Sequence, residues 1–183
     1  MGLESINWQL LVYSVLHDLA IAVYIGGSVV MDFILGPAQQ SIPPAQAQIM
    51  GQKTSDRFLV LVWVSLGVIV VTGFLRLQEK GFIVAEWPPF AGLLNWEFSY
   101  GRTVFVMFII WVLLVVNGAL ITFVLRPRLL GRLGSGTSAR QMTTSMDSKL
   151  QAAQWVQWLT RTDMALAVLA ALLGASLILG GLL

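Results

Sequence analysis

Four long stretches of the chain are almost entirely apolar, and each is long enough to cross a lipid bilayer. They run from about residues 8–35, 57–77, 102–125 and 163–183. An α-helix rises about 1.5 Å per residue, so about 20 residues span a hydrocarbon core about 30 Å thick. The pattern therefore predicts an all-α bundle of four transmembrane helices.

Proline marks the expected ends of two of these spans. The first span meets Gly36-Pro37, where proline lacks the amide donor that would continue the helix. The stretch 37–53 follows, with a Pro43-Pro44 break, and we expect a connection holding at most one short surface helix. The third span is closed in the same way by Arg126-Pro127-Arg128.

The remaining connections carry their own signals. Aromatic residues gather within 78–101, which places that loop at the membrane surface, whereas 131–139 is rich in Gly and Ser and reads as flexible. Before the last span, apolar residues recur at helical spacing, which predicts a short interfacial helix. These residues are Leu150, Ala153, Val156 and Leu159, with Trp155 and Trp158 beside them.

Small residues line the fourth span. Ala167, Ala171 and Ala175 repeat every four residues, as do Ala170 and Gly174. Small side chains allow close helix approach in lipid, so we expect this helix to make a tight contact. No internal repeat is evident from the residues.

Composition supports a single membrane domain over residues 1–183. The chain is 57% hydrophobic and only 11% charged, against about 45–50% and about 25% in soluble domains. Four spans leave no room for a second folded unit. The absence of cysteine excludes disulfides, thiolate metal sites and cysteine nucleophiles, and a net charge of +2 speaks against nucleic acid as a partner.

Basic residues set the expected orientation. Two connections, between spans one and two and between spans three and four, must lie on the same side of the membrane. They hold most of the Lys and Arg: Lys53, Arg57, Arg126, Arg128, Arg132, Arg140, Lys149 and Arg161. The other side holds only Arg76, Lys80 and Arg102. The positive-inside rule then predicts an N-out, C-out topology.

His17 is the only histidine and the main candidate for chemistry. It lies roughly 14 Å below Trp8, near the middle of the bilayer, beside Asp18. One interpretation is a structural imidazole bonded to Tyr13 or Ser14, one turn away. The other is a ligand to haem iron or to copper, because neutral imidazole binds both metals.

A single histidine limits what a cofactor site can be. A haem held by two histidines cannot be built from one copy, so a haem would be five-coordinate, ligated by His17 and a methionine such as Met107, or shared between chains. A copper site would combine His17 with a soft ligand such as Met31. Methionines in membrane helices also serve simply in packing.

Two aspartates have a structural interpretation. Asp32 lies near the inner end of the first span, where Arg57, Arg126 or Arg128 can neutralise it. Asp163, at the expected start of the fourth span, is assigned an ion pair of the same kind.

Several short motifs resemble the CopD family of bacterial copper-resistance membrane proteins. The resemblance covers most of the chain, through common membrane residues. Its motifs are Leu16-His17-Asp18-Leu19-Ala20, Tyr24-Ile25-Gly26-Gly27, Pro37, Arg57-Phe58, Thr72-Gly73, Tyr100-Gly101-Arg102 and Arg126-Pro127-Arg128.

The resemblance implies a four-helix membrane module connected with copper movement across the inner membrane. It also implies a distant relation to the four-helix haem-dependent protoporphyrinogen oxidases of bacteria. The chain departs from these families in its third span, where Val106-Met107 replaces a lysine and Asn117 stands near the expected histidines. Asp163 takes the place of a frequent glutamate. We therefore expect the scaffold to be kept while the chemistry is changed or lost.

Two functions follow as expectations. The first is a CopD-like multi-pass protein of the bacterial inner membrane, not an enzyme by itself, that holds a b-type haem or copper through His17 for electron transfer or copper handling. The second is a cofactor-free accessory subunit that packs into a larger respiratory, photosynthetic or transport complex through its small-residue fourth helix. In either case the partners are the lipid bilayer and a second copy or a larger membrane complex.

Overall fold

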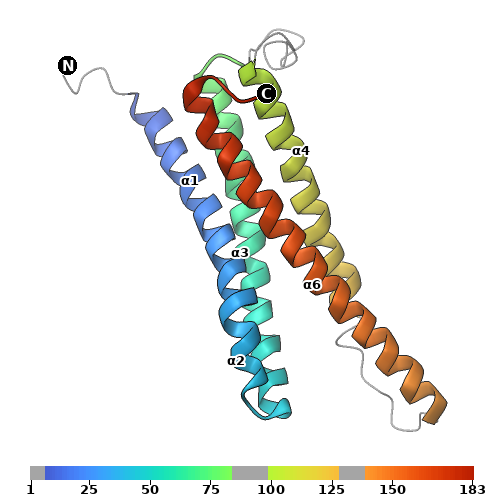
Figure 1. Ribbon diagram of the computed structural model, residues 1–183. Coiled ribbons are helices and arrows are strands. Elements are labelled where there is room, and N and C mark those ends of the chain that lie inside the picture. Colours follow the sequence, from blue (N-terminus) through green and yellow to red (C-terminus); the bar gives the residue numbers. More distant parts are fainter. Residues whose placement is uncertain (1–6, 84–98, 128–138) are drawn as a thin grey trace.

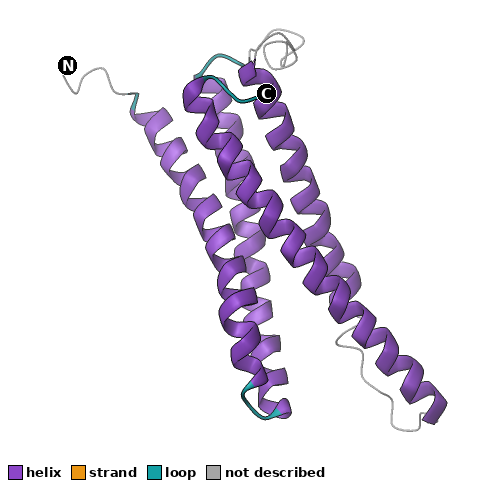
Figure 2. Cartoon of the chain, in the orientation of Figure 1, coloured by secondary structure: helices purple, strands orange, loops and turns teal. Residues whose placement is uncertain are grey.

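The computed structural model describes residues 7–83, 99–127 and 139–183, and all of its regular structure in these ranges is helical (Figures 1 and 2). The first helical rod is formed by α1 (Trp8–Val29), the π-helical η2 (Val30–Leu35) and α2 (Gly36–Gln40). It is followed by α3 (Pro44–Glu79), α4 (Ser99–Ala119) and the π-helical η3 (Leu120–Leu125). The chain ends with α6 (Ala139–Ser176) and the short 3-10 helix η4 (Leu177–Leu179).

Four helical stretches are long and apolar enough to cross a membrane: Trp8–Gln40, Ala45–Glu79, Ser99–Leu125 and Gln154–Leu179. The predicted all-α, four-helix class is therefore confirmed, and the chain is a multi-pass membrane protein. Large apolar side chains cover the outside of the bundle, as lipid requires. Examples are Leu19, Phe33, Val60, Phe123 and Leu172, all of them exposed.

The first rod continues past the proline that was expected to end it. Gly36 N–H bonds to Met31 O, five residues back, so the chain makes a wider π turn just before Pro37. Pro37 then lies in the first turn of α2, where a missing amide donor costs nothing. The predicted stop at Gly36-Pro37 was wrong, because the π turn places Pro37 in the first turn of the next helix, where its missing N–H is not needed.

Two helices begin earlier than predicted. The second span was expected from residue 57, but α3 starts at Pro44 and includes most of the expected connection. The expected interfacial helix before the last span is the beginning of the continuous α6. Neither helix has a proline after its first residue, so nothing interrupts the backbone hydrogen bonds at the membrane boundary. The expected surface loop, 84–98, and the Gly/Ser-rich stretch up to residue 138 lie outside the described residues.

The helices associate as two pairs. We call residues 8–79, with α1 and α3, the first helix pair, and residues 99–179, with α4 and α6, the second helix pair. The most extensive packing lies within each pair, and the pairs meet through α1 against α6 and α3 against α4. A buried core cluster draws on all four long helices: Tyr24, Val62, Leu66, Ile110, Leu114, Ala167 and Leu173.

The two pairs repeat one another in structure. The π-helical η2 and η3 occupy matching places, and each is followed two residues later by a proline, Pro37 or Pro127. The helices α1 and α4 run in the same direction, and α3 and α6 run in the opposite one (Figure 1). The two pairs therefore share the order and direction of their helices and the place of the π turn.

The buried positions follow the same repeat. Matching buried residues on α1 and α4 are Ala20 with Ile110, Tyr24 with Leu114, and Ser28 with Gly118; on α3 and α6 they are Val62 with Asp163, Leu66 with Ala167, and Thr72 with Leu173. None of these six pairs shares a residue type, so the sequence alone did not reveal the repeat. What the pairs share is the geometry of burial.

Candidate functional site

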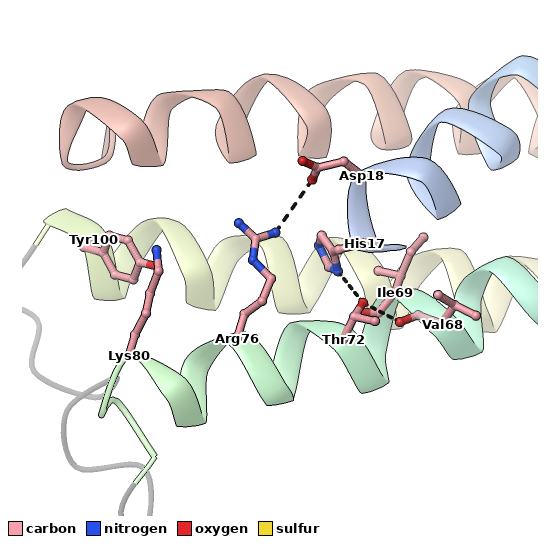
Figure 3. A network of polar contacts seen from close by, with 8 residues as sticks. All are labelled: His17, Asp18, Val68, Ile69, Thr72, Arg76, Lys80 and Tyr100. Atoms are coloured by element: carbon pink, nitrogen blue, oxygen red, sulfur yellow. Dashed lines mark hydrogen bonds and ion pairs between the residues drawn. The ribbon is translucent and has the colours of Figure 1, made fainter. Parts of the chain in front are cut away.

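His17 lies on α1 in the interface with α3, and only 8% of it is exposed. Its Nδ1 is 2.9 Å from the Thr72 hydroxyl oxygen (Figure 3). Thr72 Oγ1 in turn lies 2.6 Å from the Val68 carbonyl oxygen, which can only accept a hydrogen bond. Because the threonine hydrogen is used toward Val68, the imidazole must donate from Nδ1.

The tautomer that follows leaves Nε2 with a lone pair. Besides Thr72, the imidazole also has a hydrogen bond with the backbone of Ile69 on α3. An imidazole whose Nδ1–H is held by a protein acceptor is also the usual arrangement of a metal-bound histidine, because the hydrogen bond fixes the tautomer and the ring orientation.

The predicted structural partner of His17 was wrong. Tyr13 and Ser14 were expected because they lie one turn away on the same helix, but the bonded hydroxyl is Thr72 on α3. Gly73 explains the close approach, because a Cβ there would lie 3.4 Å from His17 Cε1. The sequence motif Thr72-Gly73 therefore supplies both the acceptor and the space.

Polar groups continue from Thr72 along one face of α3. Thr72, Arg76 and Lys80 are spaced by four residues, so they share that face. Arg76 Nη1 lies 3.7 Å from Asp18 Oδ1, and Lys80 Nζ lies 3.1 Å from the Tyr100 hydroxyl (Figure 3). This polar ladder leads from His17 to the end of the bundle that holds both termini.

The two candidate methionine ligands lie apart from His17. Met31 belongs to η2, fourteen residues further along the rod, which is roughly 21 Å away along the helix axis. Met107 packs in the other helix pair, where its Cε lies 3.4 Å from the Cβ position of Gly174. Among the described residues, no group of three or more His, Cys, Asp or Glu side chains could hold a metal ion.

The helix ends opposite the termini carry ion pairs, though not with the expected partners. Asp32 Oδ2 lies 3.5 Å from Arg161 Nε, and Arg126 pairs with Asp56 instead. The expectation that Asp32 is neutralised near the end of its span is confirmed in kind, but its partner is on α6. Arg128, another expected partner, lies outside the described residues.

Asp163 differs most from expectation. It was placed at the start of the fourth span with a basic partner, but the apolar stretch starts at Gln154 and Asp163 lies about nine residues inside it. Only 5% of Asp163 is exposed. Its Oδ1 accepts a hydrogen bond of 2.8 Å from Asn117 Nδ2, and the Tyr24 hydroxyl is its second hydrogen-bonding group. Both partners are neutral.

The small-residue face of α6 is used only in part. Ala167 is buried in the core and Ala170 packs against it, while Gly174 lies against Met107. Ala175 is exposed. The tight contact therefore lies within the chain and follows Asp163, Ala167 and Gly174 instead of the full alanine repeat.

No family model, curated protein or solved structure matches this chain. The function must therefore be argued from the site itself.

Proposed function

We propose that the chain is a membrane-embedded haem-binding module in which His17 is the axial ligand. The observation that supports this most is the hydrogen-bond chain from His17 Nδ1 through Thr72 to the Val68 carbonyl, which leaves Nε2 available as a ligand. The CopD-like motifs around His17 and Thr72-Gly73 point to the same residue.

Haem suits this site better than copper does. A haem iron already has four nitrogen ligands from its porphyrin, so one imidazole from the protein is enough. A protein copper site takes several side-chain ligands, and Met31, the candidate second ligand, lies roughly 21 Å from His17.

The polar ladder on α3 adds a second point of fit. Haem b carries two carboxylates, and such groups are held by arginine and lysine side chains. Arg76 and Lys80 lie one and two turns beyond Thr72 on the same face, between His17 and the end of the bundle. When bound, haem would supply a one-electron Fe(III)/Fe(II) couple. The chain would hold it, orient its axial imidazole and shield it from water.

The membrane context of this proposal follows the basic residues. With most of the Lys and Arg at the end opposite the termini, we place both termini outside a bacterial inner membrane. The His17 site then lies in the outer half of the bilayer.

The test is the visible spectrum of protein made in cells supplied with a haem precursor and purified in detergent. We expect a Soret band, a haem content of one per chain or one per two chains, and no stoichiometric copper by elemental analysis. The His17→Ala variant should lose the band while its far-UV circular dichroism stays helical, and added imidazole should restore the band. The Met107→Leu variant is the matched control and should keep its haem.

Two outcomes would overturn the proposal. Protein that binds stoichiometric copper and no haem would support copper handling as the function. Protein that binds neither cofactor and co-purifies with large membrane subunits would support the accessory role instead.

A further inference from the structure

The seams between the two helix pairs are chemically unequal. Along the α3–α4 seam, two hydrogen bonds join neutral groups: Trp111 Nε1 donates to Leu66 O at 3.1 Å, and Trp63 Nε1 to Thr122 Oγ1 at 3.3 Å. Charged side chains take part toward its two ends, where Arg126 pairs with Asp56 and Lys80 bonds to Tyr100. Across the α1–α6 seam the polar contacts involve carboxylates: Asp163 with Tyr24, and Asp32 with Arg161. In the structural repeat, Thr122 and Asp32 hold matching places on η3 and η2, and Val62 matches Asp163.

Asp163 is the unusual group in this seam. Counted from Gln154, it lies roughly 14 Å into the apolar stretch of α6, close to the depth at which charge is most costly. Asn117 and Tyr24 each offer it a hydrogen-bond donor, but neither carries a positive charge. A carboxylate that is buried in hydrocarbon without a cation must take up one positive charge or become neutral.

The groups around Asp163 indicate which positive charge can balance its carboxylate. On α1 the nearest titratable groups are Tyr24 and Asp32, and on α6 the nearest is Arg161, which is already paired with Asp32. On α3 there is no charged residue between Arg57 and Arg76, and α4 offers the neutral Asn117. A single carboxylate with two donors is a poor cage for a metal cation, which needs several oxygen ligands. One proton balances the site.

We propose that Asp163, Asn117 and Tyr24 form a proton-binding site in the α1–α6 seam. Water at the end of the bundle opposite the termini supplies the proton, which bonds to a carboxylate oxygen of Asp163 and makes it a neutral acid. On release, the proton returns to the same side. The hydrogen bonds from Asn117 and Tyr24 steady the carboxylate while it is ionised.

The route to that end follows the same seam. Asp32 and Tyr24 lie on the same rod, eight residues apart, and Arg161 is two residues from Asp163 on α6. The Arg161 side chain is 61% exposed, so the ion pair lies at the outside of the helix bundle. On the other side of Asp163, Ala167, Leu173 and the core cluster close the seam with apolar side chains.

The test uses dicyclohexylcarbodiimide, an apolar reagent that adds to a protonated carboxyl in a membrane and leaves an ionised one unmodified. The full-length protein in liposomes is treated over a range of pH, and the modified residue is mapped by mass spectrometry. We expect modification at Asp163 that falls as pH rises, and none in Asp163→Asn. Asp56→Asn is the matched control and should leave modification at Asp163, because Asp56 lies on α3, outside the α1–α6 seam, and pairs with Arg126. Asn117→Leu should be modified at pH values where the wild type no longer is.

Sidedness and ion competition complete the design. With the pH inside and outside the liposomes set separately, modification should follow the pH at the Arg161 end, with orientation read from a single cysteine at Ser41. Replacing choline chloride by NaCl at constant pH should change nothing. Absence of modification at Asp163, protection by NaCl, or dependence on the pH at the end with the termini would each overturn the proposal. None of these results depends on haem, so this site and the His17 site are tested separately.

Discussion

The hydrogen bond between His17 and Thr72 offers the sharpest test of the His17 site. Thr72→Val keeps the shape of the side chain and removes the acceptor for Nδ1–H. A buried donor left without a partner costs about 1–3 kcal/mol, and double-mutant cycles between helices in membranes give coupling energies of about 0.6 kcal/mol on average and about 1.7 at most. We therefore expect Thr72→Val to lower the free energy of unfolding by about 1–2 kcal/mol.

The measurement is a titration with SDS in mixed micelles, followed by circular dichroism, on the wild type, His17→Leu, Thr72→Val and the double variant. The coupling energy from this cycle should be about 0.6–1.7 kcal/mol and favourable. Thr72→Ser is the control and should behave like the wild type, because it keeps the hydroxyl that bonds to Nδ1 at 2.9 Å. If haem binds as proposed, Thr72→Val should also weaken its affinity by about 10–100-fold.

A coupling energy within error of zero would refute the reasoning at its base. It would mean that the imidazole does not donate to Thr72, and that its tautomer is not fixed. The assignment of Nε2 as the free ligand nitrogen would then have no support, whatever the spectrum of the protein.

Two further predictions concern helix packing and topology. Gly27→Ala should lower the free energy of unfolding by about 1–3 kcal/mol in the same titration, because its Cβ would lie 2.9 Å from Phe58 Cε2. Gly26→Ala is the control and should leave stability unchanged, because nothing lies within 4 Å of its Cβ. Equal effects of the two changes would contradict the α1–α3 packing. In this cysteine-free chain, Ser41→Cys should be labelled by an impermeant thiol reagent only from the cytoplasm and Gln78→Cys only from outside, and reversed labelling would invert the topology.

The sequence predicted what hydrophobicity alone determines. The number of spans and the helical class follow from apolar stretches long enough to cross lipid, because lipid leaves the backbone no other partner than itself. The positions of the helix ends were predicted less accurately. Proline was given too much weight, since a π turn before Pro37 lets the rod continue, and polar residues after Pro44 remain helical because nothing in the backbone stops them.

The polar contacts could not be predicted because they join different helices. His17 was expected deep in the first span, whereas Asp32 and Asp163 were expected near span ends with basic partners. Their observed partners are Thr72, Arg161 and Asn117, which are distant in sequence. Periodicity shows which residues share a helix face and does not show which faces meet. A small signal was present for His17, because Thr72-Gly73 combines a hydroxyl with a residue that allows close approach.

The structural repeat allows a last prediction that joins the fold to the site. Met107 and His17 hold matching places, each beside a glycine of its own helix pair: a Cβ at Gly174 would lie 3.4 Å from Met107 Cε, and one at Gly73 would lie 3.4 Å from His17 Cε1. Leu173 matches Thr72 and is buried like it. The second helix pair therefore has the backbone for the same contact and lacks only its side chains.

Met107→His together with Leu173→Thr should rebuild that contact between α4 and α6. Each single change places a polar group in the apolar core of the bundle without its designed partner and should destabilise the protein, by about 1–3 kcal/mol. Together they should recover about 0.6–1.7 kcal/mol of this loss as coupling, the range expected for the native pair. The same SDS titration measures it, and the matched control is Met107→His with Leu172→Thr, whose hydroxyl lies on the exposed face of α6 and should give no coupling. A designed pair that couples no better than this control would show that the two halves match in burial but not in the geometry that positions an imidazole.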